Sequence, residues 1–424
     1  MTKKLTMRLI PALMLFGFAG VANAAGLAVS AQTGSGVGNA FAGAAASAED
    51  AGTIFANPAG MTYLPQGHSI SLGASLLNRS VEFKNQGSTD HVAARFGVNN
   101  ANGGDAGGLA ILPIGYWAYS IAPDVWVGVG VSPTFGNKTE YNNNFIGKSA
   151  GYMSEVKQIN INPSLAIKVN DFLSLGLGFD LAHATLHGKA GIPGSATNRQ
   201  YLETESWGVG ANIGAMFQLS PSTRVGLSYR SGMSFDMDGN QKLHSPASAT
   251  LKSQKVTLDG YDTPGTLSLA VSQKLSDKWE LLGDLTWTDW SVWNKLVLKQ
   301  KSDGVTIATT TYAFEDTLRV GLGANYKYSD ALKLRFGVAF DEGAATKDVN
   351  RQMTLPDADR TWLSFGGKYT LSKASSIDFG YAHVFVKDEN TRREVYSGAT
   401  LLHTIRGKFD QSADYLSAQY NHTF

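Results

Sequence analysis

The chain has 424 residues, no cysteine and a formal net charge of +1. The lack of cysteine excludes disulfide scaffolds and thiol catalysis, and the small net charge gives no electrostatic reason to expect a nucleic-acid partner. Glycine is frequent, with 47 residues, and aromatic residues make up 10% of the chain. This composition is typical of many extended strands with aromatic borders, and unlike a disordered chain or a helical bundle.

Residues 1–24 have the pattern of a secretory signal peptide. Three basic residues precede an apolar stretch over 9–20, and Ala22-Asn23-Ala24 fits the small-x-small rule for cleavage. The alternative is a transmembrane anchor, but the apolar stretch is too short to span a bilayer as a helix. We therefore predict export and cleavage after residue 24.

Residues 25–66 do not alternate and are rich in alanine and glycine. Asn57 is a good N-cap, Pro58 is favoured at the first helical position, and Pro65 would end a short helical turn. One interpretation is a capped turn and nothing more. The other is a small plug, or hatch, made of short helices.

From residue 67 to the end, apolar and polar residues alternate with a period of two. Leu173, Leu175, Leu177 and Phe179, for example, are separated by serine or glycine. Such alternation places one set on each face of a sheet. A soluble β-sandwich gives the same alternation, so the connections between the strands must separate the two cases.

Short and long connections follow each other in strict alternation. Six short turns and seven long segments join 14 strands, a pattern typical of outer-membrane barrels. We predict an all-β fold, a 14-stranded antiparallel transmembrane β-barrel over 67–424, in the outer membrane of a Gram-negative cell. The short turns lie near 122–124, 170–171, 220–222, 276–278, 329–330 and 372–373, and the long segments near 79–107, 136–155, 188–203, 232–262, 299–311, 342–359 and 387–411.

In such a barrel the apolar set faces lipid and the polar set faces the lumen. A lumen of 14 strands is an open pore unless something fills it, so we predict that residues 25–66 form a hatch inside it. Phe424 ends an alternating last strand, as in substrates of the barrel-assembly machinery. Tryptophans near strand ends indicate an aromatic girdle, namely Trp117, Trp126, Trp279, Trp287, Trp290 and Trp293.

Three stretches of the chain have the form of sequence motifs. The first runs from Ser35-Gly36-Val37-Gly38 through Ala48-Glu49-Asp50-Ala51 to Asn57-Pro58-Ala59. The second is LPDADRTWLSFGGKY, residues 355–369, and the third is DLTWTDWSVWNKL, residues 284–296. These stretches resemble motifs of the FadL/TodX family of outer-membrane transporters for long-chain fatty acids and hydrophobic hydrocarbons. The resemblance extends over the mature chain, and the strand count matches the family's.

The resemblance implies passive uptake of long-chain fatty acids or similar compounds. Ligand would be captured in a groove of extracellular loops, pass to an internal pocket, and leave sideways through a kinked third strand. In our count that strand spans about 125–135, and Pro133, Phe135 and Gly136 are the candidate kink, although Pro133 would also suit a simple strand end. The hatch would control access through Asn57, Pro58, Ala59 and Gly60, with Asn57 bonding the backbone of the kink.

Candidate ligand residues lie near the predicted third and fourth long loops. They are Lys189, Ile192, Leu202, Met233, Phe235 and Met237. Lys189 is close to a basic position of the family, but Glu315 occupies a second one, which keeps transport of uncharged aromatic or aliphatic hydrocarbons as an alternative. Asp357, Asp359 and Arg360 are predicted to form an ion-pair cluster with a structural role.

Two alternative classes of function are a diffusion porin and an outer-membrane enzyme. A nonselective diffusion porin would share the barrel but needs an open aqueous lumen. An outer-membrane enzyme would need a nucleophile motif, and no Gly-x-Ser-x-Gly or His-Glu-x-x-His occurs. We predict no enzyme activity, no cofactor and no metal. The expected partners of a monomer are a hydrophobic ligand, outer-membrane lipid and lipopolysaccharide, and the barrel-assembly machinery.

Overall fold

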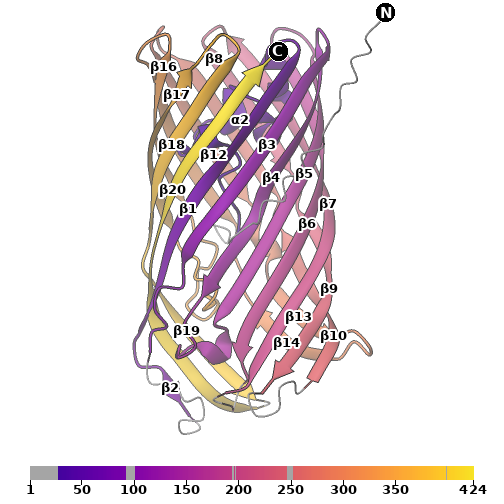
Figure 1. The fold of residues 1–424 in the computed structure, drawn as a ribbon, viewed down its shortest axis with the longest axis vertical. Helices are drawn as coiled ribbons and strands as arrows, with labels where there is room; N and C mark the ends of the chain where they lie inside the picture. The colour runs from indigo at the N-terminus through magenta and orange to yellow at the C-terminus, as the bar shows by residue number, and fades with distance from the viewer. Residues whose placement is uncertain (1–26, 92–100, 193–194, 196, 246–251, 398) are drawn as a thin grey trace, which may run out of the picture.

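The structure is a computed structural model that describes residues 27–91, 101–192, 195, 197–245, 252–397 and 399–424. It is a closed antiparallel β-barrel with short helices inside its upper end (Figure 1). The first and last wall strands, β1 (His68–Asn85) and β20 (Thr400–Thr423), pair over their length and close the circle. The predicted signal peptide lies outside the described residues.

Fourteen wall strands can be followed around the barrel, which confirms the predicted fold class. Each pairs with the next, in the circuit β1, β3, β4, β5, β6, β7, β8, β11, β12, β15, β16, β17, β18, β20. Their bounds are β3 (Gly108–Ala122), β4 (Val125–Glu140), β5 (Met153–Lys168), β6 (Leu173–Gly191), β7 (Arg199–Ser220), β8 (Thr223–Arg230), β11 (Thr266–Lys274), β12 (Trp279–Thr288), β15 (Thr317–Lys327), β16 (Leu332–Asp341), β17 (Arg360–Thr370) and β18 (Ser375–Val386).

Four neighbouring wall strands are interrupted along one hydrogen-bonded row, which passes through Arg230, Thr266, Thr288 and Thr317. Pro264 lies in one of the interruptions, and proline cannot donate a ladder hydrogen bond. Beyond the row the wall continues as separate segments, so its lower part has its own set of strands. These are β9 (Met233–His244), β10 (Lys252–Thr263), β13 (Lys295–Gln300) and β14 (Thr306–Thr311).

All six predicted short turns join wall strands at one end of the barrel, where the C-terminus also lies (Figure 1). Several predicted long loops were wrong in extent, because parts of them continue the strands. Residues 232–262, for example, are mostly β9 and β10, and 387–411 contains β19 (Glu389–Ser397), whereas residues 342–359 form the connection between β16 and β17 as predicted. In β9, apolar residues such as Met233 and Phe235 face inward and polar residues such as Asp236 face outward, so the alternation is the reverse of that in the lipid-facing wall.

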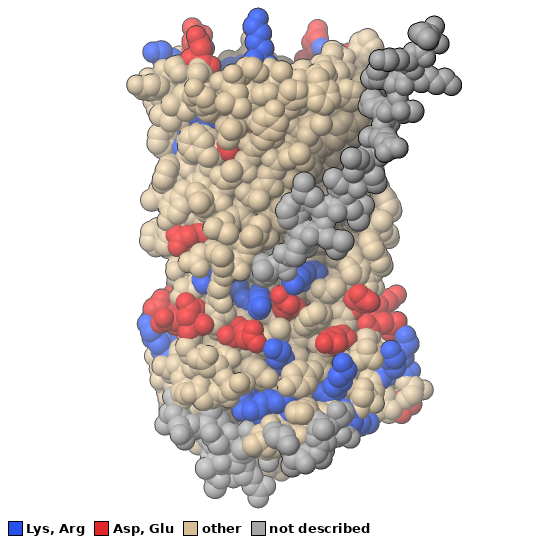
Figure 2. All heavy atoms as spheres, viewed as in Figure 1, with Lys and Arg blue, Asp and Glu red and all other residues tan. Residues whose placement is uncertain are grey.

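The face of the wall shown in Figure 2 carries a broad band with few charged side chains, and charges gather at the upper rim and in the lower half. The alternating side chains face the two sides of the wall as predicted, since Leu177 is exposed on the outside and Asp180 is fully buried inside. The tryptophan prediction was partly wrong. Trp117 and Trp279 lie on the outer face, but Trp126, Trp290 and Trp293 are buried. The strand interruption at 289–294 holds a short helical turn, η3 (Trp290–Val292), that turns Trp290 and Trp293 inward.

Four short helical segments occupy the lumen, α1 (Gly34–Val37), α2 (Ala44–Ser47), α3 (Thr53–Ala56) and η1 (Pro58–Tyr63). They press on the wall where inward-facing wall residues are glycine. A single added carbon at Gly214, Gly226 or Gly337 would clash with the backbone or side chains of the hatch. The glycines of the alternating strands therefore leave space for the hatch. Among the described residues, no helix is long and apolar enough to cross a membrane.

Candidate functional site

The third wall strand, β4, contains a bulge at the predicted kink. Pro133 pairs with Ile159 and Phe135 pairs with Gln158, so Thr134 is an extra residue. The predicted strand end at residue 135 was wrong, because β4 continues to Glu140. A bulge bends its strand and disrupts the local ladder. Pro133 therefore marks a bend in β4 and does not end the strand.

The bend separates β4 from its neighbour β3. Their pairing stops at Gly115 and Val131. Among the described strands, the rest of β3, residues 108–114, pairs with β1 alone, while β4 stays paired with β5. The wall therefore has an interval without backbone pairing between β3 and β4.

The free edge of the bent strand is occupied by the start of the described chain. Val29 N–H donates to Thr134 O at 2.9 Å, Gly136 N–H donates to Leu27 O at 2.7 Å, and Ala28 pairs with Phe135. These residues form a short antiparallel pair with the bulge. We call residues 27–29 the N-terminal segment.

This contact corrects the prediction for Asn57. Its side-chain nitrogen donates to Ala45 O at 2.8 Å and Ala215 O at 3.1 Å, and its oxygen accepts from Ala59 N–H. Asn57 is thus an N-cap, as predicted, and joins α2 and η1 to β7. It does not bond the kink. Pro58, Ala59 and Gly60 are buried with it in η1.

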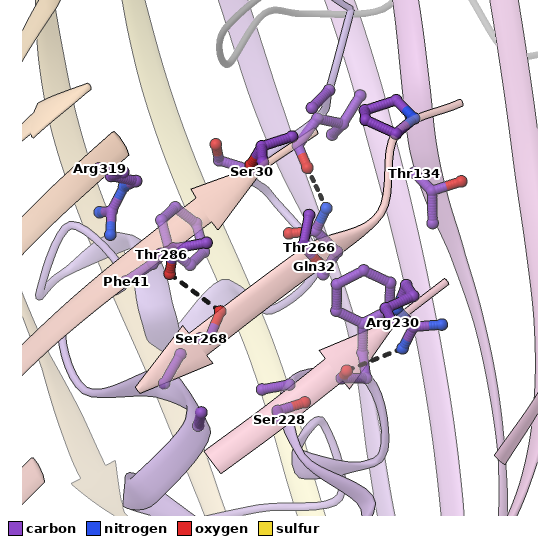
Figure 3. A pocket seen from close by; sticks show the side chains of 18 of the residues that line it. Ser30, Gln32, Phe41, Thr134, Ser228, Arg230, Thr266, Ser268, Thr286 and Arg319 are labelled. Carbon is purple, nitrogen blue, oxygen red and sulfur yellow. Dashed lines mark hydrogen bonds between the residues drawn. The ribbon is translucent and has the colours of Figure 1, made fainter. Parts of the chain in front are cut away.

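A cavity of about 220 Å³ lies between the N-terminal segment, the hatch and the wall. Its apolar lining includes Phe135, Met233 and Trp290. Its polar lining includes hydroxyl groups, among which Ser268 and Thr286 bond each other at 2.9 Å (Figure 3). The cavity therefore combines aromatic and aliphatic surface with polar groups.

Two arginines reach this cavity, and both are already engaged. Arg230 is paired with Asp180, and it donates to Phe55 O at 2.8 Å. Arg319 is paired with Asp284 at 2.8 Å and also bonds Ala40 O. Because carboxylates neutralise both charges, an anionic ligand would have to compete with Asp180 or Asp284.

The same arginines belong to a larger set that fixes the hatch. Four arginines of the wall donate to hatch carbonyls, three of which belong to the short helices α1, α2 and α3, whose last carbonyls lack partners within the helix. The pairs are Arg335 with Ser35, Arg319 with Ala40, Arg224 with Ser47, and Arg230 with Phe55. Sequence reasoning missed this set, although isolated arginines at inward positions of alternating strands are the available signal.

A second hollow, of about 190 Å³, lies toward the end of the barrel that carries the long connections. It is lined mainly by apolar residues, including Leu186, Leu258 and Leu298. Two predicted ligand residues, Lys189 and Leu202, line it as well. Lys189 pairs with Glu140 at 2.9 Å. Ile192 lies in the connection after β6 and lines neither hollow.

An apolar column joins the two hollows. The remaining predicted ligand residues, Met233, Phe235 and Met237, all face inward on β9 and belong to it. Phe235 packs edge-on against Tyr261 at 5.4 Å, and Trp290 packs edge-on against Phe135 at 6.1 Å. The column thus reaches from the outer hollow to the bulge of β4. Tyr261, Trp290 and Trp293 were missed as column residues because their strands were predicted as loop or girdle.

Of the predicted ion-pair cluster, Asp357 and Arg360 pair with each other where the chain returns from β16 to β17, whereas Asp359 pairs with Lys387 at 3.6 Å. Arg360 also pairs with Asp341 at 3.5 Å. Asp357 also accepts from Ala345 N–H, and Asp359 accepts from Gly343 N–H at 3.0 Å. The cluster ties this connection to the wall. Among the described residues, no group of histidine and acidic side chains could hold a metal ion.

Known proteins that are similar to this chain agree with this architecture. The family model described as outer membrane protein transport protein (OMPP1/FadL/TodX) matches residues 15–424. The chain is 32% identical to the 47 kDa outer membrane protein of Pasteurella multocida, over 93% of this chain and 94% of that protein. It is 28% identical to the long-chain fatty acid transport protein of Salmonella typhi, over 85% and 87%.

A solved structure gives the same result for the fold. The crystal structure of a Pseudomonas aeruginosa FadL homologue covers 94% of this chain and 100% of that chain, with a TM-score of 0.86 and 22% identity. The matching family is one of transport proteins and not of enzymes. The chain belongs to the OMPP1/FadL/TodX family of outer-membrane β-barrels, which transport hydrophobic compounds across the outer membrane.

Proposed function

We propose that the protein takes up long-chain fatty acids or chemically similar compounds, and releases them sideways through the interval between β3 and β4. The observation that carries this proposal is the apolar column between the outer hollow and the cavity beside the β4 bulge. Burial of an alkyl chain along it gains about 25 cal/mol per Å² of apolar surface. An amphipathic chain can therefore enter without an energy source.

In this mechanism the column is closed at rest. Phe235, Tyr261 and Trp293 pack against one another inside it, so ligand must displace aromatic rings to pass. The N-terminal segment is the second barrier, because it occupies the edge of β4 beside the cavity. Its release would connect the cavity with the interval between β3 and β4. The hatch residues held by the four arginines stay in place.

Uptake by cells tests the proposal directly. Cells that lack their own fatty-acid transporter would be given this protein, and the initial uptake of labelled oleate would be measured. We expect uptake well above that of the empty-vector control. Background uptake at confirmed surface abundance would contradict the proposal.

Transport of uncharged hydrocarbons is the second candidate, and the paired cations favour it. Lys189, Arg230 and Arg319 each have a carboxylate partner. A carboxylate ligand would have to displace one of these partners, whereas a hydrocarbon would not. Competition between labelled oleate and an uncharged hydrocarbon of similar length distinguishes the two. Stronger competition by free fatty acid than by hydrocarbon supports fatty acids as the substrate.

A diffusion porin fits the structure less well, because the hatch packs against inward-facing glycines around the wall. Planar-bilayer recordings separate the two mechanisms. We expect low conductance. Large, steady ion currents would show an open aqueous lumen.

A further inference from the structure

A second interval in the wall lies three strands from the β4 bulge, between β7 and β9. These strands pair as far as Glu205 and Asp238, and pairing with the preceding segment β8 begins only at Asn212 and Arg230. Between these points, six residues of β7, 206–211, face seven residues, 231–237, of the interrupted strand. The two facing stretches differ in length by one residue, as the two strands of a β-bulge do.

One end of this interval is closed by a side chain. Ser231 N–H donates to Ala211 O at 2.9 Å, and the Ser231 hydroxyl accepts from Ala211 N–H at 3.0 Å. The hydroxyl thus takes the place of a backbone carbonyl. No ladder pairing joins residues 206–210 to 232–237 in this described part of the wall. Both strands keep their pairing on the other side, with β6 and β10.

Two apolar side chains close the interval from within. A side-chain carbon added at Gly208 would lie 2.5 Å from the Phe235 ring, and one added at Gly210 would lie 2.8 Å from Met233. Phe235 and Met233 therefore lie directly over the two glycines of β7. Met233 and Ser231 also line the central cavity. Met233 therefore lies between the cavity and the wall, and Phe235 lies beside it in the apolar column.

The outer side of the interval faces the membrane boundary. Trp207 and Val209 are 58% and 59% exposed, and Trp207 packs against His183 with ring centroids 4.8 Å apart. Along β7 the outward residues change from glutamate at 203 and 205 to apolar residues at 209 and 213. An exposed tryptophan at such a change is typical of a membrane interface. Backbone pairing links this level to the β4 bulge, through Pro133, Ile159, His183 and Trp207.

We propose that this interval is a second lateral port, through which apolar ligand passes between the central cavity and the membrane. It is closed in the present structure by Met233 and Phe235. The proposal rests on the transport function proposed above. In a continuous ladder, sideways passage would break several hydrogen bonds that lipid cannot replace. Here the ladder is already interrupted, so passage requires only that two flexible apolar side chains move.

Cysteine labelling tests the port without relying on transport. The chain has no cysteine, so a single introduced thiol reports one position. F235C and M237C would be compared in proteoliposomes, with a maleimide that partitions into the bilayer. Both positions lie in the apolar column, but Met237 adjoins the intact ladder at Asp238. We expect F235C to react severalfold faster than M237C, and equal or slower reaction would overturn the proposal.

Crosslinking tests whether the port carries ligand. The W207C/D236C variant would be bridged by a bifunctional thiol reagent across the interval. The matched control is E203C/N240C, bridged where the same two strands are fully paired. If two similar exits share the flow, closing one lowers uptake to about half, because gates in parallel divide the flux. The control bridge should leave uptake unchanged.

The two proposals fail in different ways. Unchanged uptake after the W207C/D236C bridge would overturn the port while leaving the transport function intact. Absence of uptake by the unmodified protein would overturn the proposed function, and the labelling ratio of F235C to M237C would still decide the port. Normal uptake by the unbridged W207C/D236C variant would show that the substitutions themselves do no harm.

Discussion

Single residues decide how tightly the hatch is seated, and Asn57 is the clearest example. It is fully buried, and its amide joins α2, η1 and β7 by hydrogen bonds. Removing a buried donor leaves its acceptors without a partner, at a cost of about 1–3 kcal/mol. The sequence identified Asn57 as a cap from its place before Pro58. It gave no means of identifying Ala215, 158 residues away, as a partner.

We predict that N57A loosens the hatch while the barrel assembles normally. The carbonyls of Ala45 and Ala215 both lose a donor, so hatch amides should exchange hydrogen about 5- to 150-fold faster, as a loss of about 1–3 kcal/mol implies. Hydrogen-exchange mass spectrometry measures this, and heat-modifiable migration in gels monitors the barrel. Unaltered exchange across 44–63 would show that Asn57 does not hold the hatch.

A second prediction at this scale concerns glycine. G214A should displace Asn57, because the added carbon would clash with the side-chain oxygen of Asn57. G283A is the matched control, since its added carbon has no neighbour closer than 3.4 Å. We expect faster hatch exchange in G214A than in G283A. Equal exchange in the two variants would refute the close packing described for η1.

Among the elements, the hatch and the edge of β4 are held in place by different contacts. The hatch is held by buried charges, of which the group of Glu49, Lys333, Arg335 and Asp378 is the largest. Glu49 pairs with Arg335 at 2.8 Å and with Lys333 at 3.1 Å, and Asp378 pairs with Arg335 at 2.7 Å. The edge of β4 at the bulge, by contrast, is held in the described part of the chain by backbone contacts with the N-terminal segment. Movement at the gate is therefore expected in that segment before the hatch.

The ionisation of Glu49 gives a prediction about pH. Burial raises the pKa of its carboxyl, but Lys333, Arg335 and Lys368 more than offset this and hold the pKa well below its ordinary value of 4.5. A lowered pKa adds stability above the unfolded-state value, and this stability is lost as pH falls through the folded-state value. Hatch protection attributable to Glu49 should thus be equal at about pH 7 and about pH 5.

The matched variants for this prediction are E49Q and E203Q. E49Q should speed exchange in the hatch at both pH values, because it removes the charge that Arg335 and Lys333 face. E203Q should not, because Glu203 is exposed and lies 3.8 Å from Lys242. Hydrogen exchange at the two pH values provides the measurement. A pH-dependent loss of protection in the unmodified protein above about pH 5 would contradict the lowered pKa.

The β4 bulge yields a prediction about uptake. Deletion of Thr134 removes the extra residue, so β4 can pair in one register with β5 and approach β3. We expect oleate uptake to fall to about half, the share left to the second port between β7 and β9, while the barrel still assembles. T134A keeps the residue count, so it should retain the bulge and most of the uptake. Undiminished uptake by the deletion variant at equal surface abundance would argue against exit through this interval.

At the scale of the whole molecule, the sequence was sufficient to predict the barrel wall but not the arrangement of the residues inside the barrel. Alternation in stretches such as 173–181 and six short turns gave the strand number, because both follow from local chemistry. The strands of the lower wall were predicted as loops, because segments such as β9 and β10 carry polar residues on their outer faces and yet remain paired. The positions of Trp290, Arg230 and the N-terminal segment depend on contacts across the lumen. Sequence spacing does not contain those contacts.

The account's central claim is that ligand travels inside the barrel, along the column from the outer hollow to the cavity beside β4. A crystal structure with a bromine-labelled long-chain fatty acid tests this most directly, because anomalous scattering locates the bromine. We predict bromine in the outer hollow, in the column between Met237 and Met233, or in the cavity lined by Phe135 and Trp290. Bromine found only on the lipid-facing wall at saturating ligand would contradict the account.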